Sequence, residues 1–385
     1  MSHSAGPSVD VAIVGGGIVG TATAAFLAGA GLRVSLVERT AIGAGASGRN
    51  SGVVQQPRDP VLATLYHASL AIYRSLDAGS GGRLGLTAEP AGLLHVGRER
   101  AVVEAIAGAW QATDPATMPE VLGGDELRRL EPALAEDLVA CRLRIGFAVE
   151  PAAATLAFAA EAERAGVTML VGREARLIVR NRVAVGVDIG GAIQPAGAVV
   201  VAAGPWTPEL LDPSGRWRPI RPIWGVVATV DLDHPPRHVL QEAGIGIEPD
   251  DAGEPETGPA TAGDGIEFSL VTAAGATSLG STFLAAEPRP AELVEAIRAH
   301  GARFVPGLAG APLVSLRSCA RPVALDGRPL VGAVPWLERA FVAAGHGPWG
   351  ISTGPATARL IADLVLGREV AIPNALAARR FPRAG

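Results

Sequence analysis

The stretch VAIVGGGIVG, residues 11–20, decides the fold, and SLVER at residues 35–39 completes the pattern. A short apolar run at 9–14 predicts a buried strand. It leads into Gly15, Gly17 and Gly20 at the spacing G-x-G-x-x-G, and a predicted helix at 18–30 follows. A second apolar strand, 33–37, ends at Glu38. Strand, glycines, helix, strand and acid in this order are typical of a dinucleotide-binding βαβ unit.

Each glycine has its own role in such a unit. Gly15 permits the tight turn, Gly17 lets the backbone approach a pyrophosphate, and Gly20 lets the helix pack on the strand. The helix start offers unpaired N–H groups to the phosphates, and Glu38 can accept hydrogen bonds from a ribose hydroxyl. The motif alone does not separate NAD from FAD. The predicted cofactor contacts here are Gly15, Gly16, Gly17, Ile18, Val19, Gly20, Glu38 and Arg39.

Composition excludes several classes of protein. The 385 residues are 48% hydrophobic and 18% charged, which is ample for two to three domains with large cores. There is no uninterrupted apolar run of about 18 residues, so we expect no transmembrane segment. A net charge of −5 without a basic stripe argues against nucleic acid as a partner. Two cysteines cannot build a disulfide framework, and with an N-terminus unlike a signal peptide they favour a cytoplasmic setting.

The segment TAIGAGASGRNSGVV, residues 40–54, is dense in small polar residues and predicts a loop. One interpretation is a plain surface turn. The other is a second segment that contacts phosphate and flavin, in which Ser47 or Ser51 caps a following turn. Its position directly after the ribose-binding acid favours the second. The predicted contacts are Ser47, Arg49, Asn50, Ser51 and Gly52.

The succession GGGIVG, ER and GASGRNSG resembles the FAD-dependent oxidoreductases of the D-amino-acid oxidase superfamily, in particular its glycine oxidase, sarcosine oxidase and D-amino-acid dehydrogenase group. The resemblance implies FAD and an α/β fold. A Rossmann-like FAD-binding domain would interleave with an α+β substrate domain built on an antiparallel sheet. We expect the FAD domain at 9–85, 148–220 and 318–385, and the substrate domain at 86–147 and 221–317.

Three later segments fit the same resemblance. AVVVAAGPW, residues 198–206, predicts a strand that returns the chain beside the nucleotide, which implies contacts from Gly204 and Trp206 and, from a nearby strand, Ala175. SLRSCARPVALDGRPLVGAVP, residues 315–335, resembles the Arg-Pro-x-x-x-Asp-Gly-x-Pro-x-x-Gly segment of the family. VAAGHGPWGISTGPATARLIADLVLG, residues 342–367, predicts a strand, a glycine-rich turn and a helix whose positive end can stabilise negative charge on the flavin. The implied contacts in that last element are Gly345, Gly347, Trp349, Gly350, Ile351 and Ser352.

The resemblance makes Arg321 the candidate that binds the substrate carboxylate, as a bidentate guanidinium would. The alternative is a structural salt bridge. His346, beside the flavin turn, either tunes flavin charge or binds substrate as a catalytic residue, or only constrains the backbone. Gln55, Trp224 and Trp349 complete the predicted substrate-binding set.

Two departures from the family leave the substrate open. Pro348 stands where glycine oxidases tend to carry a cation, and Trp349 stands near the position of a lysine in sarcosine oxidases. Trp224 and Trp349 could form an apolar wall that favours a larger or cyclic amino acid. Cys319 lies where sarcosine oxidases attach flavin covalently, but Arg-Pro follows it here, which favours a buried, inert thiol.

The sequence therefore predicts an enzyme that oxidises the C–N bond of a small, N-alkyl or cyclic amino acid to an imine, with FAD reduced. Oxygen or another acceptor would reoxidise the flavin. Alternatives are a dehydrogenase that passes electrons to a quinone or a protein, a flavin-binding subunit of a heteromeric complex, and an NAD-dependent dehydrogenase. Homo-oligomers and hetero-oligomers both stay open.

Overall fold

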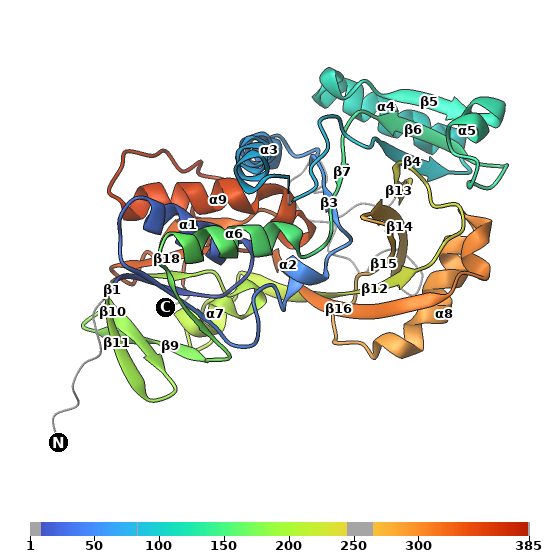
Figure 1. Cartoon of the computed structure of the whole chain (residues 1–385). Helices are drawn as coiled ribbons and strands as arrows, with labels where there is room; N and C mark the ends of the chain where they lie inside the picture. Colours follow the sequence, from blue (N-terminus) through green and yellow to red (C-terminus); the bar gives the residue numbers. More distant parts are fainter. Residues whose placement is uncertain (1–8, 83, 245–264, 384–385) are drawn as a thin grey trace.

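The structure, a computed structural model, describes residues 9–82, 84–244 and 265–383 (Figure 1). Its first sheet has the strand order β17-β18-β11-β1-β2-β8, and β9 and β10 extend it from β11. The neighbours from β18 to β8 are parallel, whereas β17 runs antiparallel to β18. The strands are β1 (Val9–Val14), β2 (Val34–Glu38), β8 (Thr168–Val171), β9 (Ala175–Arg180), β10 (Val183–Ile189), β11 (Ala192–Val201), β17 (Leu330–Ala333) and β18 (Ala340–Ala344).

This sheet is buried on both faces, which explains why its central strands read as continuous apolar runs. In β1, Val11 and Ile13 enter one core, while Ala12 and Val14 enter the core on the opposite face. Figure 1 shows a group of helices over one face of the sheet, with the β9–β10–β11 hairpins on the other side. These helices are α1 (Ile18–Gly29), α3 (Pro60–Ser80), α6 (Ala153–Arg164) and α9 (Gly350–Val365).

The second sheet has the order β16-β12-β15-β14-β13-β4-β6-β5. All of its neighbouring strands are antiparallel except β13 and β4, which are parallel. Its long strands β12 and β16 reach from beneath the first half of the molecule into the second (Figure 1). The strands are β4 (Leu93–Gly97), β5 (Glu120–Gly123), β6 (Val139–Leu143), β12 (Ile220–Val230), β13 (Val239–Glu242), β14 (Ile266–Ala273), β15 (Ala276–Thr282) and β16 (Leu313–Ala324).

One face of this second sheet packs against α8. Phe268 of β14 stacks on Phe304, which follows α8, with ring centroids 4.5 Å apart. Leu270 enters the same core. Since side chains alternate along a strand, Glu267, Ser269 and Val271 belong to the opposite face. The remaining elements are α2 (Ala46–Arg49), α4 (Arg100–Thr113), α5 (Gly124–Leu130), α7 (Thr207–Leu211), α8 (Pro290–Ala302), β3 (Val53–Val54) and β7 (Phe147–Ala148).

The predicted α/β class with two interleaved parts is confirmed. The sequence patterns missed β13 altogether and did not identify β16 as a strand. The strand β16 also continues past the predicted domain boundary at 317/318, and the division into domains stays a prediction. Within the described ranges, no helix is both long enough and apolar enough to cross a membrane.

Candidate active site

A large cavity of about 940 Å³ is lined by residues from both halves of the molecule. Gly17, at the start of α1, and Gly350, at the start of α9, both lie on its wall, and Arg321 of β16 lies in it as well. The other predicted residues on the wall are Gly15, Gly16, Ile18, Val19, Glu38, Arg39, Ser47, Arg49, Asn50, Ser51, Gln55, Ala175, Gly204, Trp206, Trp224, His346, Gly347, Trp349, Ile351 and Ser352. Three predicted residues, Gly20, Gly52 and Gly345, do not line the cavity.

The glycine-rich turn leaves no room for side chains. A Cβ atom at Gly20 would overlap the carbonyl oxygen of Gly15, so the close approach of α1 to the turn requires glycine. Gly15 has a φ of +116°, and a Cβ there would overlap the carbonyl oxygen of Ala202. The expected tight turn and close helix packing are therefore present.

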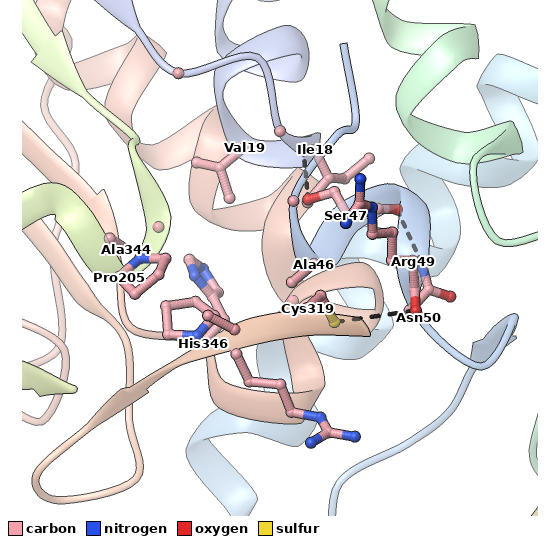
Figure 2. A pocket seen from close by; sticks show the side chains of 18 of the residues that line it. Ile18, Val19, Ala46, Ser47, Arg49, Asn50, Pro205, Cys319, Ala344 and His346 are labelled. Carbon is pink, nitrogen blue, oxygen red and sulfur yellow. Dashed lines mark hydrogen bonds between the residues drawn. The ribbon is translucent and has the colours of Figure 1, made fainter. Parts of the chain in front are cut away.

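Ser47 has a different role from the predicted one. It does not cap the turn that follows it. Its hydroxyl accepts a hydrogen bond from the backbone N–H of Ile18, 3.0 Å away, at the first turn of α1 (Figure 2). The loop at 40–54 thus folds back over the start of α1. Ser47 supplies the side-chain acceptor that the N-cap residue of this helix, Gly17, lacks.

Glu38 is held beside the glycine turn. Its Oε2 accepts a hydrogen bond from the Gly16 N–H at 2.7 Å, and its Oε1 accepts from the backbone N–H and the hydroxyl of Thr40 at 2.8 and 3.0 Å. Nearby, the guanidinium of Arg39 lies 4.6 Å from the ring centroid of Trp206. These groups form one end of the cavity, which we call the nucleotide end: Gly15–Gly17, Glu38, Arg39 and Trp206.

The start of α9 is braced from two sides. The Ser352 hydroxyl accepts from the Gln55 N–H at 2.9 Å, and the Tyr73 hydroxyl donates to the Ile351 carbonyl at 2.7 Å. His346, just before the helix, is buried, and its Nε2 lies 3.0 Å from the Thr357 hydroxyl. Burial lowers the pKa of His346 to about 4, so the imidazole is neutral at pH 7.

Arg321 has an unusual environment for a cation. Its Nη1 donates to the Thr282 carbonyl at 2.8 Å and its Nη2 to the Ser281 hydroxyl at 2.9 Å. Its guanidinium lies over the Phe283 ring, 4.2 Å from the centroid. No carboxylate of the described chain lies within 4.0 Å of it, so the structural salt bridge considered as an alternative has no partner there.

The room for this guanidinium comes from Gly225. A Cβ at Gly225 would overlap the terminal nitrogens of Arg321. Arg321 pairs with Ile223 of the adjacent strand β12, and its side chain extends across β12 to reach Ser281 and Thr282 of β15. We call this region the substrate end of the cavity: Gly225, Ser281, Thr282, Phe283 and Arg321.

Comparison with known proteins places the chain. The family model described as "FAD dependent oxidoreductase", named DAO, matches residues 10–364. The chain belongs to this family. It is 28% identical to a glycine oxidase of Pseudomonas aeruginosa over 96% of this chain and 98% of that protein. It is 29% identical to a D-amino acid dehydrogenase of Allorhizobium ampelinum, over 75% of this chain and 66% of that protein. The crystal structure of glycine oxidase from Geobacillus kaustophilus superposes with a TM-score of 0.80 at 26% identity, over 97% of this chain and 99% of that one.

The predicted family, enzyme class and cofactor are thereby confirmed: the protein is an FAD-dependent oxidoreductase. The residues of this DAO protein fit FAD. The starts of two helices, α1 and α9, lie at one cavity, so the positive ends of two helix dipoles meet there. Glycine at Gly15 and Gly20 lets the turn and the start of α1 pack closely at this cavity, since a Cβ at either position would overlap backbone atoms. The contacts of the individual residues with FAD stay predictions.

Cys319 points into the cavity from β16, between Arg317 and Arg321 along the strand. The thiol is 6% exposed, and its Sγ makes a weak contact of 3.9 Å with the Arg49 carbonyl (Figure 2). Burial raises the pKa of this thiol, so the protonated, unreactive form dominates at pH 7. This favours the inert-thiol interpretation over a covalent flavin link.

Sequence reasoning missed Arg317. Its guanidinium donates to the Asn50 carbonyl at 3.1 Å, the Thr229 hydroxyl at 2.6 Å and the Ser278 hydroxyl at 2.7 Å. Arg317 therefore connects the loop at 40–54 to strands β12 and β15 of the second sheet. A signal was available, because Arg317, Cys319 and Arg321 alternate and so share one face of a strand.

The cavity also contains residues from β13 and β14 that no sequence pattern indicated: Gln241, Glu242 and Glu267. The amide groups of Gln241 and Gln55 donate to each other at 3.0 and 3.2 Å. These residues were missed because β13 was not predicted as a strand. Nothing in the sequence showed which face of β14 would meet the cavity.

Proposed function

We propose that the protein oxidises the C–N bond of an amino acid to an imine. The observation that carries the proposal is the Arg321 guanidinium, which has no acidic partner within 4.0 Å among the described residues and lies in the same cavity as the cofactor cradle. Bound FAD would supply the chemistry by accepting the α-hydrogen as a hydride, while the nitrogen of the neutral amine gives up a proton to solvent. Water then adds to the imine and releases the amine and an oxo acid.

Arg321 would bind the substrate carboxylate. Its two hydrogen bonds go to neutral oxygen atoms, so no carboxylate is bonded to the guanidinium within the described residues. A carboxylate matches the planar donor fork of arginine and can accept two parallel hydrogen bonds. Ser281, Thr282 and Phe283 hold the guanidinium in place before the substrate binds. Binding then costs little free energy for ordering the Arg321 side chain.

Trp224 and Trp349 would form apolar parts of the wall around the substrate. Pro348 also lines the cavity, so no cation stands at that turn. The wall therefore suits a substrate with more apolar surface than glycine. His346 is neutral and adds no charge to the site. It is positioned to keep the turn before α9 in place through its bond with Thr357.

The relatives support this reaction class, because their names describe glycine oxidases and D-amino acid dehydrogenases. The proposal covers two electron acceptors. In one case oxygen is reduced to hydrogen peroxide. In the other, electrons pass to a quinone or a protein. The proposal includes a reducing, cytoplasmic setting, which the two free, buried cysteines support.

The test uses the purified protein with its flavin under anaerobic conditions. Amino acids are added one at a time, and the absorbance of oxidised flavin at about 450 nm is followed. A substrate should reduce the flavin and so lower this absorbance. Admitting oxygen with a peroxide assay, or adding a dye, then identifies the acceptor. Failure of every amino acid to bleach the flavin contradicts the proposal and favours a non-catalytic flavin-binding subunit.

The matched variant is Arg321→Met, which keeps the length of the side chain and removes its charge. It should retain FAD and lose about 100-fold to 1,000-fold in kcat/KM, as expected when one partner of an enclosed ion pair is removed. Arg321→Lys keeps the charge but lacks the planar donor fork, so its kcat/KM should lie between those of the wild type and Arg321→Met. Equal activity of Arg321→Met and wild type would remove Arg321 from the site.

A further inference from the structure

The substrate end carries a second charge of opposite sign. The guanidinium of Arg321 reaches across β12 to β15. The next strand in the sheet is β14, which carries Glu267, and after it comes β13, which carries Glu242. Both carboxylates line the cavity. Positive and negative groups are thus placed in order across one face of the sheet.

Glu267 is aimed at the cavity by the strand that carries it. The next residue, Phe268, packs into the core under α8, so Glu267 faces the other way. The pairing of β14 with β15 is also irregular here, with a register shift between Ile266 and Ser269. Such bulges re-aim a side chain locally.

The Glu267 carboxylate has no hydrogen bond or ion pair with any residue in 9–82, 84–244 or 265–383. Its neighbour Glu242 differs in this respect. Oε2 of Glu242 lies 2.6 Å from Nε2 of His300 and accepts from the Phe268 N–H at 3.1 Å. Glu242 is therefore satisfied by the protein, whereas Glu267 presents free acceptor sites to the cavity.

An enclosed carboxylate without a partner is unfavourable, and a cation in the cavity would remove that cost. Burial raises the pKa of Glu267 to about 7, and the negative Glu242 adds to the rise, while Arg321 and His300 oppose it. The Glu267 carboxyl group therefore changes between its neutral and charged forms near neutral pH. A bound cation would lower this pKa and favour the charged form.

The cation that Glu267 would bind is not the α-amino group of the substrate. Transfer of the α-hydrogen requires a neutral α-amine, and a carboxylate held against that amine would stabilise its protonated form. A cationic group at the far end of the substrate side chain carries no such conflict. Glu267 forms no ion pair with Arg321 among the described residues, so its carboxylate oxygens lie more than 4.0 Å from the Arg321 nitrogens, and both groups line the cavity.

We propose that this site prefers amino acids with a basic side chain, whose carboxylate binds Arg321 and whose cationic end binds Glu267. As a statement about turnover, this rests on the proposed function. As a statement about binding, it does not. Glu267 would then be the residue that determines specificity.

Binding is tested first, with two ligands that have no α-amine and cannot be oxidised: 6-aminohexanoate and hexanoate. Calorimetry on the flavin-loaded protein at pH 8 should show 6-aminohexanoate binding about 10-fold or more tightly than hexanoate, as expected for hydrogen bonds between charged groups. Glu267→Gln, which keeps the shape and removes the charge, should abolish the difference. The control is Glu136→Gln, which changes an exposed acid that lies just before β6 of the same sheet and does not line the cavity.

Turnover is tested second, with pairs of similar size: lysine against norleucine and arginine against citrulline, in both enantiomers. The wild type should favour the charged member in kcat/KM by about 10-fold or more. The preference should grow as pH rises through about 7, because Glu267 must lose its proton to bind a cation. The charged and titratable groups around it, Arg321, Glu242 and His300, are unchanged in Glu267→Gln, which should lose both the preference and its pH dependence.

The outcomes separate the two proposals. Equal binding of the two ligands to the wild type overturns the role of Glu267, even if neutral amino acids bleach the flavin. Equal loss of lysine and norleucine turnover in Glu267→Gln also overturns it, because it would show a role at the α-amine or in folding. Selective binding of 6-aminohexanoate without any flavin bleaching supports the role of Glu267 and contradicts the oxidation reaction.

Discussion

The two ends of the cavity are built from different parts of the polypeptide. The nucleotide end uses mostly backbone: the glycine turn at Gly15–Gly17, the start of α1, and only a few side chains such as Glu38. The substrate end uses residues of three neighbouring strands, β16, β12 and β15, and Glu267 of the next strand, β14, lines the same cavity. We expect the first end to recognise a shape common to dinucleotides and the second to recognise charge at defined positions.

This difference has a consequence for substitutions. At the nucleotide end, the sensitive atoms are those that would fill space near the backbone, so small additions should be the most damaging. At the substrate end, the sensitive property is the placement of Arg321 and of the groups around it. Variants at the two ends should therefore fail in different measurements.

Gly20→Ala should have the largest effect. Its Cβ would overlap the Gly15 carbonyl oxygen, and neither backbone segment can yield cheaply because α1 packs directly on the turn. We expect a protein that no longer retains FAD during purification, with a loss of about 1–3 kcal/mol in the free energy of unfolding. The measurements are flavin absorbance and urea unfolding. Gly29→Ala, in the same helix with open space around it, is the control and should retain FAD.

Gly225→Ala should act only at the substrate end. The added methyl would displace the guanidinium of Arg321 from Ser281 and Thr282. We expect kcat/KM to fall by about 100-fold, in line with the cost of misplacing a binding group by an ångström, while FAD stays bound. Steady-state kinetics and flavin absorbance measure the two properties. Loss of FAD in this variant would show that the two ends are not separable.

His346→Gln tests the border between the two ends. In the folded protein the pKa of His346 is about 4, below the ordinary value of 6.5. Its contribution to stability is complete above about pH 6.5 and is lost as pH falls toward 4, because the unfolded chain binds the extra proton. Between pH 7 and pH 5, the free energy of unfolding of the wild type should fall by about 2 kcal/mol more than that of the variant. Urea unfolding at both values measures this, and identical losses in the two proteins would contradict a neutral, buried imidazole.

Glu38→Gln should have the smallest effect, again at the nucleotide end. The amide keeps the shape and one acceptor, but it loses the charge that faces the Gly16 N–H. We expect the dissociation constant for FAD to rise about 10-fold, the usual worth of a hydrogen bond to a charged group. At saturating FAD, kcat should not change. A change in the lysine-to-norleucine preference would place Glu38 in contact with the substrate, contrary to the separation of the two ends.

The nucleotide end could be predicted because its signals are local. Gly15, Gly17, Gly20 and Glu38 act through backbone geometry within one βαβ unit, and the structure shows the tight turn and the close helix packing that their spacing indicates. The helix before residue 367 and its glycine-rich turn were likewise visible, and both segments line one cavity as expected.

The substrate end was predicted only in part. Arg321 came from a family resemblance, whereas Trp224 and Trp349 came from the hypothesis of an apolar wall; all three line the cavity. Arg317 was missed although its alternation with Arg321 was available. Glu267 and Gln241 could not have been found. Their importance depends on β14 lying beside β15 and on β13 lying beside β14, and no local pattern encodes these neighbours.

The sequence by itself therefore determined the α/β class, the cofactor cradle and the family, because these depend on residue spacing within short segments. Only the tertiary structure decided that Arg321 crosses β12 over Gly225 and that Glu267 stands one strand beyond its guanidinium. The physical reason is that charge recognition depends on distances between strands. Those distances are set by how residues far apart in the chain pair in one sheet.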